Sequence, residues 1–151
     1  MKKRVLFICT GNTCRSQIAE ALVNARRGDT WQAYSAGMHP GRQPSAHALQ
    51  ALAEIGIETE GSKPSAVDEF AGQPFDLVVT LCDDVEGRCP SWPEQAKRLH
   101  LGFPDPYLAT GTEAQVMHAY RDVRDGMARR LLALLDAESW PTQSDSVNSR
   151  E

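Results

Sequence analysis

Residue types that suit oxyanion chemistry gather in one segment of this 151-residue chain, Cys9-Thr10-Gly11-Asn12-Thr13-Cys14-Arg15-Ser16. Gly11 and Asn12 accept left-handed backbone angles, which let successive N–H groups turn inward and form a cradle for an anion. Arg15 adds a planar fork of donors that fits two oxygens of a tetrahedral oxyanion at once. We therefore predict that residues 10–16 bind an oxyanion, and we call residues 9–16 the oxyanion loop.

Cys9 begins this loop, in an environment that favours the thiolate over the thiol. The positive end of the following helix and the Arg15 charge both stabilise a negative sulfur, and Ser16 is well placed to donate a hydrogen bond to it. A thiolate is the nucleophile in cysteine chemistry. A buried packing cysteine is the alternative, but it leaves the other residues of the loop unexplained. We predict that Cys9 attacks the oxyanion. For Cys14 we favour packing over the role of an auxiliary thiol that pairs with Cys9.

An attack on an oxyanion expels oxide or alkoxide, so a proton donor is needed near Cys9. Asp105 is the best candidate in the sequence, because Pro104 and Pro106 stiffen the chain around its carboxylate. An aspartate that only shapes a turn would have the same neighbours. The spacing alone leaves both interpretations open, and we predict the proton donor.

Cys82 and Cys89 form a second pair of cysteines, separated by six residues. Zinc motifs use shorter spacings, and neither His47 nor His100 pairs with these cysteines at ligand spacing, so we predict no metal. Two structural thiols are one alternative. We favour a redox pair, because the intervening segment is polar, contains Gly87 and could move easily enough for sulfur to approach sulfur.

Apolar periodicity predicts the elements that position these residues. Strands are expected at 4–8, 31–36, 75–81 and 98–101, and helices at 15–27, 44–55, 65–70 and 112–137. Their alternation predicts an α/β fold, a doubly wound four-stranded parallel sheet with helices on both faces. Ligands bind beyond the carboxyl ends of such strands, where Cys9 stands. We expect one catalytic domain over residues 1–137 and a polar, mobile tail over residues 138–151.

Composition narrows the class of protein. The formal net charge of −4 argues against a nucleic-acid partner, whose binding would need clustered lysine and arginine. No apolar run is long enough to span a membrane, and the apolar stretch after Met1-Lys2-Lys3-Arg4 is too short for a signal peptide. We therefore expect a cytoplasmic protein, in which the four cysteines are better suited to catalysis or metal binding than to a static disulfide framework.

The chain resembles the low-molecular-weight protein tyrosine phosphatase superfamily over nearly its whole length, up to about Asp136. The resemblance rests on the Cys9 to Ser16 loop and on Asp105-Pro106. Three features are more similar to its thioredoxin-coupled arsenate reductases: the loop continued through Gln17-Ile18-Ala19-Glu20, Thr80-Leu81-Cys82 with Cys89-Pro90, and Gly102-Phe103 before Asp105.

This resemblance implies an arsenate reductase that works by a three-thiol relay. Cys9 forms a thiol–arseno adduct held by Arg15 and the loop amides, and Asp105 protonates the leaving oxygen. Cys82 then attacks the Cys9 sulfur and releases arsenite, and Cys89 attacks Cys82 to leave a disulfide for thioredoxin. The resemblance implies no cofactor, phosphate or sulfate as competing anions, and a monomer.

Some relatives bind potassium beside the loop, through residues that match Asn12, Glu20 and Ser35. Further along, this chain has Lys63, so we hypothesise that its ammonium replaces the cation and makes activity insensitive to potassium. Tyr107 resembles the phosphatases, which often carry an aromatic residue there, and implies some phosphatase side activity. The alternatives are a tyrosine phosphatase that uses Cys9, Arg15 and Asp105 alone, and a redox-sensing or anion-binding module without turnover.

Overall fold

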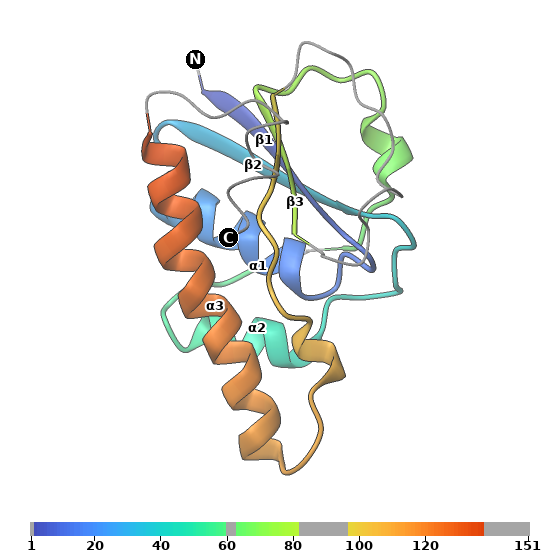
Figure 1. Ribbon diagram of the computed structural model, residues 1–151, viewed down its shortest axis with the longest axis vertical. Helices are drawn as coiled ribbons and strands as arrows, with labels where there is room; N and C mark the ends of the chain where they lie inside the picture. The colour runs from blue at the N-terminus through green and yellow to red at the C-terminus, as the bar shows by residue number, and fades with distance from the viewer. Residues whose placement is uncertain (1, 60–62, 82–96, 138–151) are drawn as a thin grey trace.

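The computed structural model describes residues 2–59, 63–81 and 97–137. Four strands form one fully parallel sheet, as predicted, and their order is β2-β1-β3-β4. The strands are β1 (Lys3–Cys9), β2 (Trp31–Gly37), β3 (Leu77–Thr80) and β4 (Lys97–His100). Figure 1 shows β1 and β3 in the middle of the sheet, so the carboxyl end of β1 lies between two neighbouring strands. This central place positions the oxyanion loop.

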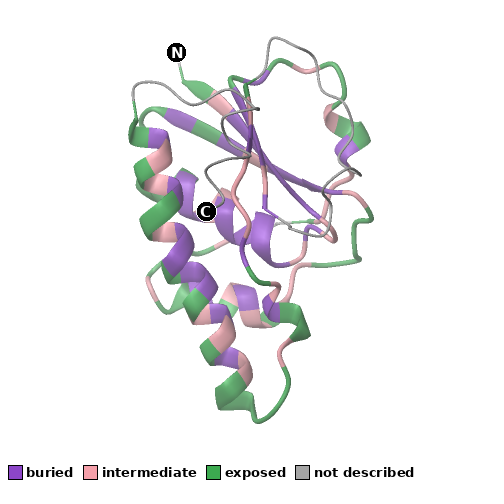
Figure 2. Ribbon diagram, viewed as in Figure 1, coloured by how far each residue is buried: buried purple, intermediate pink, exposed green. Residues whose placement is uncertain are grey.

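Alternate residues of the strands pack into two separate cores, because side chains of a strand point to opposite faces of the sheet. Val5 and Phe7 of β1 belong to the larger core, and Leu6 and Ile8 belong to the smaller one. The described helices cover the two faces unequally. The three α-helices pack over the larger core, whereas the 3₁₀ helix η1 (Val67–Phe70) covers the smaller core (Figure 2). Cys14 of the oxyanion loop belongs to the larger core, so the loop packs against the face that the three α-helices cover.

The three α-helices are α1 (Arg15–Arg26), α2 (Ala46–Ala53) and α3 (Glu113–Asp136). They are a little shorter than predicted, because the residues before α2 and α3 serve as caps. Ser45 accepts a hydrogen bond from the Ala48 amide, and Thr112 forms a reciprocal capping box with Gln115. Near the end of α3, Leu135 is buried in the larger core, whereas Leu134 is only partly buried.

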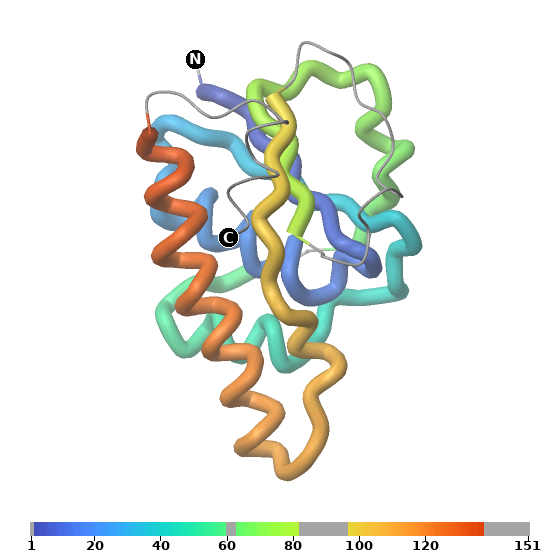
Figure 3. Tube along the Cα trace, viewed as in Figure 1, coloured from blue at the N-terminus to red at the C-terminus, as the bar shows by residue number. Residues whose placement is uncertain are grey.

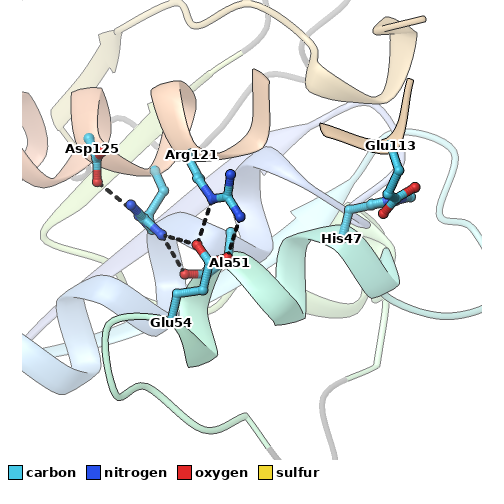
Figure 4. A network of polar contacts seen from close by, with 7 residues as sticks. His47, Ala51, Glu54, Glu113, Arg121 and Asp125 are labelled. Atoms are coloured by element: carbon cyan, nitrogen blue, oxygen red, sulfur yellow. Dashed lines mark hydrogen bonds and ion pairs between the residues drawn. The ribbon is translucent and has the colours of Figure 1, made fainter. Parts of the chain in front are cut away.

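A charged network fastens α3 to α2 (Figure 4). The Glu54 carboxylate accepts from Arg121 at 2.6 and 2.8 Å and from Arg124 at 3.0 Å. The hydrogen bond from Arg121 is the main reason why the pKa of Glu54 falls to about 2. Arg124 is buried and also donates to the Ala51 carbonyl at 2.8 Å, near the end of α2. This network holds the two helices that lie behind the oxyanion loop.

The predicted strand at 75–81 is shorter in the structure. Phe75 packs in the smaller core before β3 begins, and the Leu81 amide extends the pairing by donating to the Ile8 carbonyl at 2.9 Å. Leu81 therefore lies beside the last residues of β1. The tail 138–151 and both Cys82 and Cys89 lie outside the described residues. Among the helices that the structure describes, none is both long enough and apolar enough to cross a membrane.

Candidate active site

The oxyanion loop is held from outside by the segment that follows β2, and Figure 3 shows these two turns of chain next to each other. Four loop carbonyls accept hydrogen bonds of 2.8–3.1 Å from amides of that segment. The pairs are Met38 to Cys9, His39 to Thr10, Gly41 to Gly11 and Ser45 to Thr13. The C=O and N–H of one trans peptide point in opposite directions. The amides of residues 10, 11, 12 and 14 are therefore turned to the inner side of the loop, as an anion cradle requires.

Asn12 takes the one left-handed backbone conformation of the loop, with φ of 54°, whereas Gly11 does not have a positive φ. The Asn12 side chain is buried and fully engaged. Its Nδ2 donates to Ser16 Oγ at 2.6 Å, and its Oδ1 accepts from the Ser65 amide at 2.7 Å and from Gln17 Nε2 at 3.4 Å. Asparagine tolerates this conformation better than most residues. These contacts fix the turn at the centre of the cradle.

Cys9 Sγ lies on the inner side of the loop, within reach of two donors. The Asn12 amide donates to the sulfur at 3.3 Å, and Ser16 Oγ lies 2.9 Å from it. The Ser16 hydroxyl already accepts from Asn12 Nδ2, so its own proton is available to the sulfur. Both hydrogen bonds favour a negative sulfur over a neutral thiol. The loop can thus hold Cys9 as a nucleophile below a bound oxyanion.

Arg15 and Asp105 meet at the edge of the same pocket. Arg15 is buried, its Nη1 donates to the Phe103 carbonyl at 3.2 Å, and its Nη2 lies 3.3 Å from Asp105 Oδ2. The other carboxylate oxygen of Asp105 accepts from the Tyr107 amide at 3.0 Å and begins the 3₁₀ helix η3 (Pro106–Leu108). Asp105 therefore shapes a turn and also lies beside Arg15 at the pocket, and its role as the proton donor stays a prediction.

A pocket of about 390 Å³ opens above the loop. Besides the oxyanion loop and Asp105, it is lined by residues that sequence reasoning did not assign to the site. These are His39, Gly41, Arg42, Gln43 and Ser45. Tyr107, which is already notable in the sequence as a point of similarity to the phosphatases, lines the pocket as well. In the sequence, the segment from 37 to 45 is notable only for its glycines and prolines, which are typical of turns. Its function here comes from backbone amides, which leave no trace in the side chains.

Gly37 stands where the oxyanion loop and the end of β2 approach most closely. A Cβ there would lie 2.8 Å from the Thr10 carbonyl oxygen and 2.9 Å from the Asn12 amide. Both are backbone atoms, so Gly37→Ala must displace the loop, at a cost of about 1–3 kcal/mol. We expect the dissociation constant for inorganic phosphate, measured by titration calorimetry, to rise about tenfold.

Gly126→Ala is the matched control for this substitution. A Cβ at Gly126 would meet nothing closer than 3.8 Å, and alanine suits the interior of α3 better than glycine. Its phosphate affinity should equal that of the unmodified protein. Unchanged phosphate affinity in a folded Gly37→Ala variant would show that the close approach does not shape the cradle.

The residues predicted as a cation neighbourhood form two hydrogen-bonded groups. One consists of Glu20 and Ser35, and in the other Gln17 joins Asn12 to the Lys63 backbone. Burial raises the pKa of Glu20, and a hydrogen bond from Ser35 Oγ partly opposes that effect. Lys63 is exposed, and its backbone carbonyl accepts from Gln17 Nε2 at 3.2 Å. This contact does not involve the ammonium. Within the described ranges, no hydrogen bond or ion pair joins the Lys63 ammonium to Asn12, Glu20 or Ser35. Replacement of a cation by this ammonium stays a prediction.

Comparison with known proteins agrees with this fold. A model of the low molecular weight phosphotyrosine protein phosphatase family matches residues 4–143. The chain therefore belongs to this family, which confirms the class that the sequence predicted.

Three similar proteins refine this assignment. The arsenate reductase of Halalkalibacterium halodurans is 41% identical over 86% of this chain and 93% of its own length. The low molecular weight protein tyrosine phosphatase of T. tengcongensis has a similar structure, with a TM-score of 0.72 and 25% identity over 89% of this chain and 99% of its own. A thioredoxin-dependent arsenate reductase of Corynebacterium glutamicum has a TM-score of 0.63 and 27% identity over 87% of this chain and 61% of its own.

Proposed function

We propose that this protein reduces arsenate to arsenite and that Cys9 is the first of three thiols in the reaction. One observation carries the proposal: Cys9 Sγ lies within hydrogen-bond distance of the Asn12 amide and Ser16 Oγ, in a loop with four carbonyls turned outward to the segment after β2. Such a loop favours a thiolate and a tetrahedral oxyanion together. The similarity to an arsenate reductase over most of both chains supports arsenate as that oxyanion.

The first step is nucleophilic displacement at arsenic. The Cys9 thiolate attacks As(V), a sulfur–arsenic bond forms, and one arsenate oxygen departs as water after it accepts a proton from Asp105. Arg15 and the loop amides neutralise the charge on the remaining oxygens. No change of oxidation state occurs here, so the step is the same for arsenate and for a phosphoryl group.

The second stage carries the electrons. The Cys82 thiolate attacks Cys9 Sγ and forms a disulfide, while the electron pair of the sulfur–arsenic bond passes to arsenic, which leaves as As(III). Cys89 then attacks Cys82, which frees the Cys9 thiolate and leaves a Cys82–Cys89 disulfide. Leu81 is the last described residue before this pair. Its amide donates to the carbonyl of Ile8, the residue before Cys9, at 2.9 Å. That neighbourhood supports an encounter between Cys82 and the Cys9 adduct.

A dithiol must return two electrons for each turnover. We propose thioredoxin as this reductant, because thioredoxin and related dithiols reduce exposed protein disulfides, and a structurally similar arsenate reductase is thioredoxin-dependent. Protein thiols carry every electron in this scheme, so we propose that no metal or organic cofactor takes part. Phosphate and sulfate, which have the same tetrahedral shape, should compete for the loop.

Phosphate ester hydrolysis is the second candidate function. It needs only Cys9, Arg15 and Asp105, and water would release the adduct instead of Cys82. The similarity to a tyrosine phosphatase favours it, and so does Tyr107, which lines the pocket and is 70% exposed. An aryl group could lie on that ring. We propose this as a side activity of the same site.

Cys89→Ser distinguishes the two reactions. Without Cys89 the relay should stop once Cys82 has taken the Cys9 sulfur, so we expect one arsenite for each chain and then no further turnover. Hydrolysis of an aryl phosphate by the reduced variant should be unchanged, because it does not use this thiol. The measurement is arsenite release under anaerobic conditions with thioredoxin, thioredoxin reductase and NADPH, followed by mapping of the accumulated disulfide.

Cys14→Ser is the matched control, because it removes a cysteine that the relay does not use. It should continue past one turnover. Unchanged arsenate turnover in Cys89→Ser would refute the relay. Slow stoichiometric reaction of the unmodified protein, with thioredoxin present, would instead indicate an anion-binding or redox-sensing module.

A further inference from the structure

A small polar cluster lies behind the oxyanion loop, on the side where α2 and α3 pack against it. It consists of Cys14, Ser45 and Tyr120. Tyr120 Oη lies 3.4 Å from Cys14 Sγ, and Ser45 Oγ donates to Tyr120 Oη at 3.1 Å. Cys14 is 3% exposed and Tyr120 is 2% exposed. The site as described so far gives the Tyr120 hydroxyl no function, although α3 buries it directly behind a loop that binds an anion.

The direction of the hydrogen bonds follows from the Ser45 hydroxyl. Its oxygen accepts from the Ala48 amide at 3.3 Å, and its proton goes to Tyr120 Oη. The Tyr120 proton is then left for Cys14 Sγ. Burial is the main cause that raises the pKa of Tyr120, so its hydroxyl keeps this proton, and burial likewise raises the pKa of the Cys14 thiol. Cys14 therefore stays neutral while it accepts from Tyr120.

Ser45 also acts on the loop directly. Its backbone amide donates to the Thr13 carbonyl at 2.9 Å, so one residue holds both the Thr13–Cys14 peptide and the hydroxyl that contacts the Cys14 side chain. The N–H of that peptide belongs to Cys14 and is turned to the inner side of the loop. Two restraints thus act on one amide donor, through the carbonyl before it and through the side chain of its own residue.

The Tyr120 ring is held by a stacked neighbour, and its helix is held by contacts with α2. The His47 ring stacks on it with 5.3 Å between ring centroids, and His47 Nε2 lies 2.9 Å from the Glu113 carboxylate (Figure 4). Ser45 begins α2, and Tyr120 belongs to the middle of α3. The charged network around Glu54 fastens these two helices to each other. The position of the hydroxyl is therefore set by the helix pair and not by the loop that it contacts.

We propose that Tyr120 is a positioning residue for anion binding: its hydroxyl, oriented by Ser45, holds Cys14 so that the Cys14 amide stays directed at the bound oxyanion. The inference rests on the anion-binding part of the proposed function. Tyr120 touches neither the substrate nor Cys9 in this scheme. Its effect reaches the anion through one peptide of the loop, and it should therefore appear in affinity more than in the chemical step.

Tyr120→Phe removes this hydroxyl and keeps the ring. A buried hydrogen bond contributes about 1 kcal/mol, so the dissociation constant for inorganic phosphate should rise about threefold to tenfold. The KM for arsenate should rise by a similar factor, with a smaller change in kcat. Tyr34→Phe is the matched control, since the Tyr34 ring packs on Phe70 and Phe75 in the other core and its hydroxyl makes no hydrogen bond to any residue the structure describes.

A double-mutant cycle with Cys14→Ala tests the route. If the hydroxyl acts through Cys14, Tyr120→Phe should have no further effect on phosphate affinity once Cys14 is alanine. Additive losses would overturn that route. A lower Tm with unchanged phosphate affinity at a temperature where Tyr120→Phe is fully folded would show a structural role only, and would overturn the proposal. If the unmodified protein binds no phosphate, the proposed function fails first and this inference fails with it.

Discussion

Cys9→Ser should abolish both arsenate turnover and aryl phosphate hydrolysis while the protein still binds phosphate. A serine hydroxyl at this position stays protonated near neutral pH, and removal of a catalytic nucleophile typically costs 10⁴-fold or more in rate. The cradle should survive, because its shape comes from backbone hydrogen bonds between the loop and residues 38–45 and from the buried Asn12 side chain. The measurements are initial rates for both reactions and the phosphate dissociation constant of the folded variant.

The contrast between rate and affinity is the informative part of this experiment. Cys14→Ser serves as the matched control in the same loop, and it should lose less than about tenfold, because a serine hydroxyl can still accept from Tyr120. Residual arsenate reduction in Cys9→Ser near the level of the unmodified protein would mean that another cysteine attacks arsenate. Loss of phosphate binding would mean that the sulfur itself organises the loop.

Arg15→Lys should lower kcat/KM for arsenate by about 10²–10³-fold, the usual effect of losing one preorganised donor to transition-state charge. The guanidinium is buried and has its geometry set by the Phe103 carbonyl at 3.2 Å and Asp105 Oδ2 at 3.3 Å. A lysine ammonium keeps the charge but offers no planar pair of donors to two oxygens. Steady-state kinetics together with the phosphate dissociation constant measure the effect.

Arg124→Lys is the matched control for Arg15→Lys, because Arg124 is also a buried arginine with both a carbonyl and a carboxylate as partners. Its contacts join α2 to α3 and do not touch the pocket. It should lower Tm and change arsenate kinetics little. Equal kinetic losses in the two variants would show that Arg15 acts on stability and not on the anion.

The sequence predicted the sheet and the place of the oxyanion loop at the end of its first strand well, for one physical reason. Parallel strands in an α/β protein are buried on both faces, so they appear as short apolar runs, and turn residues end them. The run before Cys9 and the run before Leu81 have this pattern, and both became neighbouring strands. The chemistry-bearing types at Cys9 and Arg15 also lie within one local segment, so their proximity did not depend on tertiary structure.

Other parts of the site depend on contacts between residues far apart in the chain, and periodicity does not encode them. Tyr120 lies within the predicted helix 112–137 and has no neighbour in the sequence that marks it as part of the site, yet its hydroxyl meets Cys14 across 106 positions of sequence. Asp105 could not be assigned from spacing, because the same carboxylate caps a turn and faces Arg15. The amino ends of two helices were predicted one or two residues too early, because Ser45 and Thr112 cap these helices from outside.

The backbone hydrogen bonds that hold the oxyanion loop affect which substitutions this protein can accept during evolution. Met38, His39 and Gly41 hold the cradle through backbone amides, which every amino acid except proline supplies, so these contacts do not fix the side chains at positions 39, 42 and 43. His39, Arg42 and Gln43 nevertheless line the pocket. Substitutions at these three positions can therefore alter which oxyanions or esters enter, while the nucleophile and its cradle stay intact.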